Sequence, residues 1–251
     1  MDMKKISQAA QALKKSGNAV AVTGAGVSTE AGVPDFRSPG GLYEKMGGED
    51  KVIPLINIDA FIDNVAGFYD FHWKRFDYEP PVPCEAHTVL AEMEEKRLLK
   101  GIVTQNTDGL HQKAGSKNII PIHGNADRYV CISCGKTHVQ EYARTFIPGV
   151  PECDECDGLL KPNIVLYGEN VSRYNDAAAM IMNADCLLVI GTSLTVYPIA
   201  GLVHEYSLTG RSLIMINKGA TRLDGAAELK IEVGETDTLG EILREIYRRG
   251  V

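Results

Sequence analysis

Four cysteines occur as two C-x-x-C pairs separated by 18 residues: Cys131 and Cys134, then Cys153 and Cys156. Each C-x-x-C turn lets two thiolate sulfurs reach one tetrahedral zinc ion, and this separation is typical of a four-thiolate site. Four thiolates close the coordination shell, so such an ion holds the chain together and performs no chemistry. The pattern predicts one structural zinc rather than a redox pair, in a reducing compartment.

A second set of residues able to do chemistry consists of polar and glycine residues that follow short apolar runs. Ligands of open α/β sheets bind outside the carboxyl ends of the strands, so these residues are candidates for one shared site. Turns also begin where strands end, which explains any single member equally well but not the whole set. Its members are Gln105, Asn106, Asp108, His123, Gly191, Thr192, Ser193 and Asn217.

The loop GAGVSTEAGVPDFR, residues 24–37, begins like a dinucleotide-binding loop with Gly24-x-Gly26. The standard fingerprint has its third glycine at position 29, but Thr29 stands there and the next glycine is Gly32. The polar cluster that ends the loop is also unusual. The glycines alone leave open whether this is an altered cofactor loop or one built for something other than hydride transfer.

The elements that position these residues alternate along the chain. Six short apolar runs predict strands at residues 19–24, 101–106, 119–123, 186–191, 212–217 and 229–233. Helical patterns separate several of them at residues 87–96, 172–183, 197–208 and 238–249. Strands that are apolar on both faces, alternating with helices, predict a doubly wound, Rossmann-like α/β fold with a parallel sheet of about six strands.

Two stretches break this alternation and read as insertions that form a smaller domain. Residues 36–83 are aromatic-rich, with a predicted helix over 61–76, and residues 126–161 carry the cysteine pairs as a zinc ribbon. The Rossmann-like part then comprises residues 1–35, 84–125 and 162–251, all within one module that spans 1–251.

Composition limits the classes of partner. A hydrophobic content of 44% is ordinary for a globular protein, and the net charge of -7 argues against nucleic acid as the main ligand. No apolar run is long enough to span a membrane, and the N-terminus reads as a surface helix rather than a signal peptide. We therefore expect a cytoplasmic protein without nucleic-acid or membrane partners, for which a monomer is plausible.

Taken together, these features resemble the sirtuins, which are NAD-dependent protein-lysine deacylases, in a compact single-module form. The resemblance covers the chain from about residue 19 to 247. It rests on an ordered set of motifs: GAGVSTEAGVPDFR (24–37), TQNTDGLHQKAG (104–115), IHGN (122–125), the two C-x-x-C pairs, KPNIVLYGE (161–169), GTSLTVYP (191–198) and the strand that ends in Asn217.

The resemblance implies that NAD is consumed as a co-substrate. In sirtuins the bond between nicotinamide and ribose breaks, and the acyl group of a modified lysine is transferred to ADP-ribose. A base must activate a ribose hydroxyl, a task suited to His with its ordinary pKa near 6.5. His123 in IHGN matches the family's base, and Asn106 and Asp108 match its polar pair around the ribose and carboxamide. The other histidines, His72, His87, His111, His138 and His204, match no catalytic position.

The same resemblance implies the remaining NAD contacts. Backbone N–H groups of the first loop residues approach the pyrophosphate, Phe36 shields the nicotinamide side from water, Arg37 contacts phosphate, and Gln105 contacts the ribose. The implied contacts are Gly24, Ala25, Gly26, Ser28, Asp35, Phe36, Arg37, Gln105, Asn106 and Asp108, with Gly191, Thr192, Ser193, Asn217 and Lys218 on the adenosine side.

The implied second substrate is an acyl-lysine protein or peptide. It would add as an extended strand between Val165-Leu166-Tyr167-Gly168-Glu169 and a segment near Tyr197, contacts that involve main chain more than side chains. The acyl-lysine would run through an apolar tunnel lined by residues such as Phe36, Val165 and Tyr167.

Three departures from the family pattern qualify these expectations. Thr107 replaces an aliphatic residue beside the nicotinamide pocket, and Lys161 replaces the commoner arginine before Pro162. Family members that remove succinyl or malonyl groups carry Tyr-x-x-Arg, whereas this chain has Tyr69-x-x-His72, with Arg75 one turn further on. A mostly neutral His cannot replace the bidentate pairing of Arg with a carboxylate, so we expect a preference for acetyl or other neutral acyl groups.

Three alternative functions are weighed against the deacylase. The same bond cleavage could serve ADP-ribosyl transfer to a protein. A non-catalytic NAD-responsive binding module would have no need of His123, Asn106 and Asp108 together. A dehydrogenase is disfavoured by the glycine spacing and by the lack of a clear acidic residue after a second strand.

Overall fold

The protein is described here by a computed structural model, which covers residues 1–74 and 80–251. Its larger sheet has six parallel strands in the order β3-β2-β1-β7-β8-β9. All six predicted strands are present, so the doubly wound fold is confirmed. The strands are β1 (Ala19–Thr23), β2 (Gly101–Thr104), β3 (Ile119–Pro121), β7 (Cys186–Ile190), β8 (Ser212–Asn217) and β9 (Leu229–Glu232).

Helices cover both faces of this sheet, and its strands β1, β2 and β7 are therefore buried along their whole length. Successive strand residues alternate between two cores: Ala21 and Leu188 belong to one, Val22 and Val189 to the other. On the first face pack α1 (Met3–Lys15), α6 (Glu85–Glu95) and α11 (Leu239–Gly250); on the second, α9 (Tyr174–Asn183) and α10 (Ile199–Ser207). The four helices predicted between the strands and at the C-terminal end of the chain are confirmed to within two residues at each end.

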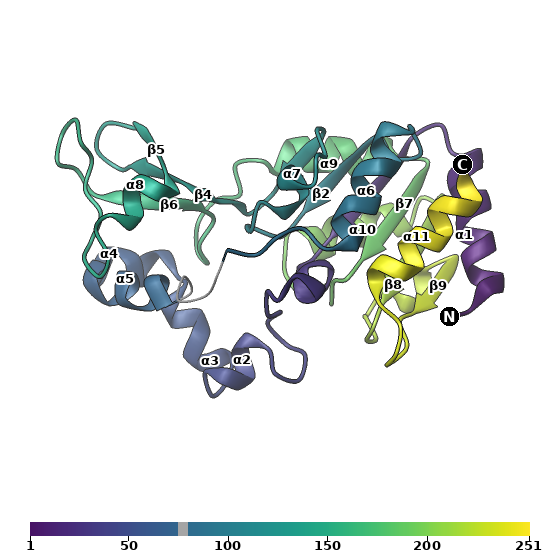
Figure 1. Ribbon diagram of the computed structural model, residues 1–251, viewed down its shortest axis with the longest axis horizontal. Helices are drawn as coiled ribbons and strands as arrows, with labels where there is room; N and C mark the ends of the chain where they lie inside the picture. The colour runs from purple at the N-terminus through teal and green to yellow at the C-terminus, as the bar shows by residue number, and fades with distance from the viewer. Residues whose placement is uncertain (75–79) are drawn as a thin grey trace.

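A smaller antiparallel sheet in the order β5-β4-β6 lies at the other end of the molecule from β9 (Figure 1). It belongs to the cysteine-bearing stretch and packs against the helical stretch around Phe61, Tyr69 and Tyr129. Its members are β4 (Gly124–Cys131), β5 (Thr137–Val139) and β6 (Leu160–Ile164), with α8 (Gln140–Arg144) beside them.

The helical stretch differs from its prediction. The single helix expected over residues 61–76 is two helices, α4 (Ile58–Asp63) and α5 (Val65–Lys74), and residues 75 and 76 lie outside the described part of the chain. Asn64 separates them because its side-chain oxygen accepts the Gly67 N–H at 3.0 Å, a local bond that competes with helix continuation.

Short helical segments lie in and after the cofactor loop, in the β2–β3 connection and in the β8–β9 connection. They are η1 (Ala25–Ala31), α2 (Leu42–Lys45), α3 (Glu49–Val52), η2 (Ile53–Leu55), α7 (Leu110–Lys113) and η3 (Asp224–Ala226). Among the described residues, none of the helices is long and apolar enough to cross a membrane.

Candidate active site

The parallel direction of the strands brings the predicted polar residues to one edge of the larger sheet. Gln105, after β2, donates from its backbone N–H to Thr23 O at 3.0 Å and from its side chain to Thr192 Oγ1 at 3.0 Å. The Gly26 N–H donates to Gly191 O at 2.8 Å. Segments that follow β1, β2 and β7 are therefore joined directly by hydrogen bonds.

Two glycines of the first loop are required by this close approach. A Cβ on Gly24 would lie 2.6 Å from the Cβ of Thr192, and one on Gly26 would lie 2.9 Å from the Cα of Gly191. Real Cβ atoms do not come so close, so any larger residue would push β1's loop away from β7's end. The Gly24-x-Gly26 pattern thus serves the packing of two strand ends.

Asn106 and Asp108 lie together on the turn after β2, with Ser28 between them. The Asn106 amide nitrogen donates to Gly24 O at 3.1 Å and to Ser28 Oγ at 3.0 Å. Ser28 Oγ donates to Asp108 Oδ2 at 2.7 Å, while Asp108 Oδ1 accepts the Leu110 N–H at 2.9 Å. The predicted polar pair is thereby held rigidly against η1.

His123 lies between β3 and β4 and is half-buried. Its Nδ1 lies 3.1 Å from Gln105 O, and because a carbonyl only accepts, Nδ1 carries the proton. Burial lowers the pKa of His123 below its ordinary value, and the bond to Gln105 O opposes this shift only in part. The ring is therefore neutral near pH 7, with Nε2 as the basic nitrogen.

The loop over Asp35, Phe36 and Arg37 folds back on itself and on α2 and α3. Asp35 Oδ1 accepts the Ser38 N–H at 2.9 Å, and Arg37 pairs with Glu49 at 2.8 Å and lies over the Tyr43 ring. The Phe36 ring also contacts Tyr43, edge to face, and 39% of Phe36 is exposed. The Phe36 ring thus presents part of its surface to solvent at the end of the cofactor loop.

The adenosine-side candidates gather at the ends of β7 and β8. Ser193 Oγ lies 3.0 Å from Thr195 Oγ1, and the Asn217 amide donates to Gly219 O at 3.0 Å. Lys218 is exposed beside them. These residues share the sheet edge with Gly191 and Thr192, as the sequence predicts.

The predicted peptide-binding segment, residues 165–169, is held from both sides. The Val165 N–H donates to His123 O at 2.9 Å, while Tyr167 exchanges backbone hydrogen bonds with Ile56 and Ile58 at 3.0 and 2.9 Å. The segment therefore joins His123 to the helical stretch. Tyr197, the other predicted peptide contact, is 76% exposed.

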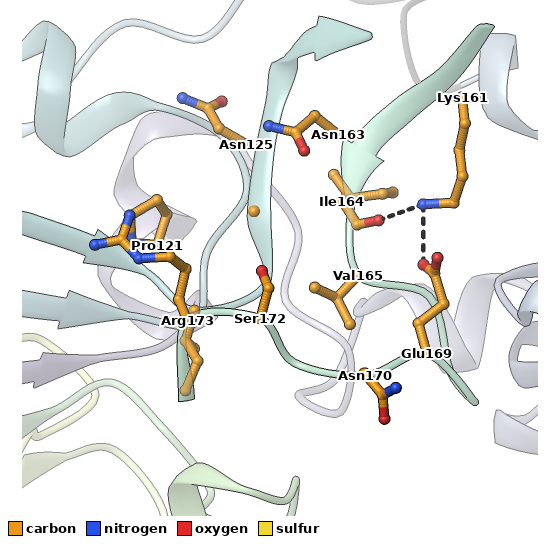
Figure 2. Close-up of a pocket in the computed structure, with 12 residues that line it drawn as sticks. Pro121, Asn125, Lys161, Asn163, Ile164, Val165, Glu169, Asn170, Ser172 and Arg173 are labelled. Carbon is orange, nitrogen blue, oxygen red and sulfur yellow. Dashed lines mark hydrogen bonds and ion pairs between the residues drawn. The ribbon is translucent and has the colours of Figure 1, made fainter. Parts of the chain in front are cut away.

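Glu169 is engaged within the protein. Its carboxylate accepts the Leu166 N–H at 2.7 Å and pairs with Lys161 at 2.9 Å. Lys161 Nζ also donates to Ile164 O at 2.8 Å, and Figure 2 shows both dashed contacts at one end of a pocket that Val165 also lines. Lys161 and Glu169 thus brace the segment 165–169 against β6.

The four paired cysteines form a cluster that fits zinc. Their sulfurs lie within 4.8 Å of one another, with Cys131 Sγ 3.5 Å from Cys156 Sγ and Cys134 Sγ 3.7 Å from Cys153 Sγ. Zinc–sulfur bonds of about 2.3 Å in a tetrahedron give sulfur separations of about 3.8 Å. The distances suit one four-thiolate ion and exceed those of disulfide bonds, in agreement with all six cysteines being free.

Two histidines to which the sequence assigns no catalytic position lie next to the site. His87 Nε2 lies 3.2 Å from Ser28 Oγ, and His111 Nε2 lies 2.9 Å from Thr23 Oγ1. Both are buried, with ring centroids 4.9 Å apart. His87 belongs to α6 and His111 to α7. Only the fold shows that these two helices lie beside the cofactor loop, so no signal in the sequence marks their position.

Comparisons with known proteins agree with this geometry. Residues 24–198 match the Sir2 family. An NAD-dependent protein deacetylase of Clostridium tetani is 41% identical over 93% of this chain and 95% of its own, and that of Thermotoga maritima is 37% identical over 93% and 95%. A solved Sir2 structure with a p53 peptide and NAD+ has a TM-score of 0.86 at 36% identity, covering 100% of this chain and 99% of its own. This chain therefore belongs to the Sir2 family.

Proposed function

We propose that the protein is an NAD-dependent protein-lysine deacetylase, which transfers the acyl group to ADP-ribose and releases nicotinamide. The observation that carries this proposal is His123, a neutral histidine with a basic Nε2, fixed at the sheet edge beside the Asn106–Ser28–Asp108 cluster. Relatives named NAD-dependent protein deacetylase and a Sir2 structure with a deacetylated p53 peptide and 3'-O-acetyl ADP ribose support it.

The site residues of the chain have separate roles in the proposed reaction. NAD supplies the ribose carbon and its hydroxyl as a co-substrate. His123 Nε2 takes the proton of the ribose hydroxyl, and the bond from Nδ1 to Gln105 O stabilises the imidazolium that results. Asn106 and Asp108 orient the carboxamide and ribose. Phe36 closes over the reacting groups and excludes water, which favours acyl transfer over hydrolysis of NAD.

The second substrate is an acyl-lysine peptide bound as an extended strand along residues 165–169, opposite Tyr197. Support comes from the exposed position of Tyr197, the link between Val165 and His123, and relatives solved with acetylated peptide. Since its carboxylate is engaged by Leu166 and Lys161, Glu169 contributes main chain rather than side chain to this contact.

Among acyl-lysine substrates, those with short neutral acyl groups are preferred. The proposed tunnel residues Phe36, Val165 and Tyr167 are uncharged at neutral pH. Tyr69 and His72 lie in the core of the helical stretch, where Tyr69 donates to Leu160 O and His72 Nε2 lies 2.7 Å from the Tyr129 hydroxyl. Neither is placed to pair with a succinyl carboxylate, and Arg75 lies outside the described residues.

The six-stranded and three-stranded sheets belong to two parts of the chain with different proposed roles. We propose that residues 1–35, 84–125 and 162–251 form a Rossmann-like part that supplies most of the NAD contacts, and that 36–83 and 126–161 form a small domain built on a structural zinc. Free cysteines are consistent with a reducing compartment such as the cytoplasm.

Mass spectrometry of an acyl-peptide panel with NAD tests the proposal, with the wild type compared with His123→Ala. We expect the wild type to convert acetyl-lysine to lysine with release of nicotinamide and O-acetyl-ADP-ribose, at least tenfold faster than succinyl-lysine. His123→Ala should lose about two orders of magnitude or more, the usual contribution of a general base. Equal turnover by the two proteins would refute the mechanism, and transfer of ADP-ribose from NAD to protein without deacetylation would replace it.

A further inference from the structure

Ser28 is the centre of a buried hydrogen-bond cluster behind the proposed nicotinamide site. Ser28 is 1% exposed, and its hydroxyl has three partners: Asp108 Oδ2 at 2.7 Å, Asn106 Nδ2 at 3.0 Å and His87 Nε2 at 3.2 Å. A hydroxyl has one proton to donate and two lone pairs to accept with. The three contacts therefore use its whole capacity.

The direction of each bond follows from the partners. The Asp108 carboxylate can only accept, and the Asn106 Nδ2 can only donate, so the Ser28 proton points to Asp108. The remaining lone pair of Ser28 must then accept from His87, whose proton sits on Nε2. His87 is fully buried, and this burial lowers its pKa against a smaller opposing effect of the Asp108 charge, so the ring is neutral and has a single proton to place.

The opposite nitrogen of His87 has a matching partner. If Nε2 carries the proton, Nδ1 must accept, and the Cys84 backbone N–H at the start of α6 lies 3.3 Å from it. The Cys84 thiol lies 3.1 Å from the same nitrogen and 3.3 Å from Val27 O. A relay of aligned bonds thus runs from Cys84 through His87 and Ser28 to Asp108.

From this relay we infer that His87 is a positioning residue for NAD: by donating to Ser28, it directs the Ser28 proton to Asp108 and fixes the carboxylate against which nicotinamide is held. The inference rests on the proposed function. Without the His87 donor, the Ser28 hydroxyl has a spare lone pair and can rotate away from Asp108. The carboxylate then loses one of the two bonds that orient it.

Two substitutions of His87 each keep one half of the relay. In His87→Gln, the longer amide reaches the position of Nε2 and still donates to Ser28. In His87→Asn, the shorter amide reaches the position of Nδ1 and still accepts from the Cys84 N–H, so α6 keeps its first turn while Ser28 loses its donor.

The expected results separate positioning from folding. A single lost hydrogen bond corresponds to about a fivefold effect, so His87→Asn should lower kcat/KM for NAD about fivefold and weaken nicotinamide inhibition by a similar factor. The KM for the acetyl peptide should not change. His87→Gln should stay within about twofold of the wild type in all three measurements.

His111→Gln is the matched control. His111 is equally buried and adjacent to His87, but its Nε2 bonds to Thr23 rather than to Ser28, and Gln can keep that bond. It should leave kcat/KM for NAD within about twofold of the wild type. Thermal melting of all three variants checks that each is folded.

Equal effects of His87→Asn and His87→Gln on NAD, an equal effect of His111→Gln, or a parallel rise in peptide KM would overturn the inference. Calorimetric titration with NAD separates this from the proposed function. If the wild type bound NAD but did not deacetylate peptides, the proposed activity would fail, while the ratio of NAD affinities between the two His87 variants would still decide the relay.

Discussion

At position 123, the direction of one hydrogen bond decides which imidazole nitrogen can act as a base. Gln105 is the last residue hydrogen-bonded to β1's end, so its carbonyl is rigidly placed, and it fixes the proton of His123 on Nδ1. Half-burial then lowers the pKa of the ring. A nitrogen that is unprotonated at neutral pH and aimed away from the backbone is what proton abstraction from a hydroxyl requires.

The lowered pKa of His123 predicts the acid limb of the pH–activity profile. A protonated imidazole cannot accept a proton, so kcat falls as pH falls through the pKa of His123. Because burial places this pKa below the ordinary value of about 6.5, activity should persist to a lower pH than a solvent-exposed histidine would allow. Steady-state kcat for an acetyl peptide measured from pH 5 to 8 checks this. A midpoint at or above 7 would contradict it.

Among the elements, the segment 165–169 depends on β6 for its position. Lys161 is 14% exposed and Glu169 is 25% exposed on their side chains, so their ion pair is partly shielded from solvent. Lys161 also donates to Ile164 O, and Glu169 also accepts the Leu166 N–H. The ion pair and these two hydrogen bonds together fix the main chain that is proposed to pair with the peptide. Lys161, which stands where the family more commonly has arginine, therefore has a defined structural role.

Breaking this brace should weaken peptide binding selectively. We expect Lys161→Met to raise the KM for the acetyl peptide about fivefold, since it removes the ion pair with Glu169 and the hydrogen bonds to Pro162 O and Ile164 O. The KM for NAD should stay constant, and Lys161→Arg should restore the wild-type value. Lys230→Met serves as the matched control. Lys230 pairs with Asp224 away from this segment, and the two side chains are 25% and 23% exposed, which is comparable to the Lys161–Glu169 pair. An equal rise in peptide KM for Lys230→Met would show that the effect is general loss of stability.

Zinc removal should act on the smaller sheet first. Cys131 and Cys153 belong to the same core as Phe61 and Tyr69, so the cysteine cluster supports both the antiparallel sheet and the helical stretch. A strong chelator, or Cys153→Ala, should therefore abolish amide protection in β4–β6 and α4–α5 while the six-stranded sheet keeps its own core. Hydrogen-exchange mass spectrometry measures this. Uniform loss of protection over both sheets would contradict it.

For the molecule as a whole, buried neutral histidines make stability depend on pH. Burial lowers the pKa of His111 to about 3 and lowers the pKa of His87 and His123. Below about pH 6.5 the unfolded chain binds protons at these positions while the folded protein does not. Their stabilising contribution is therefore complete above pH 6.5 and is lost as pH falls towards 3.

The free energy of unfolding should accordingly decrease below pH 6.5, by up to about 1.4 kcal/mol per pH unit for each histidine that stays neutral in the fold. Urea denaturation at a series of pH values between 4 and 7.5 measures the slope. His111→Gln should reduce the slope by one such contribution, because glutamine takes up no proton in either state. An unchanged slope in this variant would show that His111 is protonated in the native protein.

The sequence by itself determined the parallel sheet, the zinc cluster and most of the residues at the sheet edge. These depend on local patterns: strands that are apolar on both faces must be covered on both faces, and the C-x-x-C spacing places sulfurs within reach of one ion. The break at Asn64 was missed because the competing side-chain bond to Gly67 is not visible in the apolar pattern.

Only the tertiary structure decided how residues distant in sequence share hydrogen bonds. It set the proton of His123 on Nδ1, engaged Glu169 with Lys161, and joined His87 to Ser28 across 59 positions. The last of these depends on the packing of α6 against η1, because a hydroxyl or imidazole has no preferred partner until the fold removes water and leaves one within reach. The first loop, Gly24–Arg37, likewise depends on tertiary contacts, because it packs against the end of β7 and against α6.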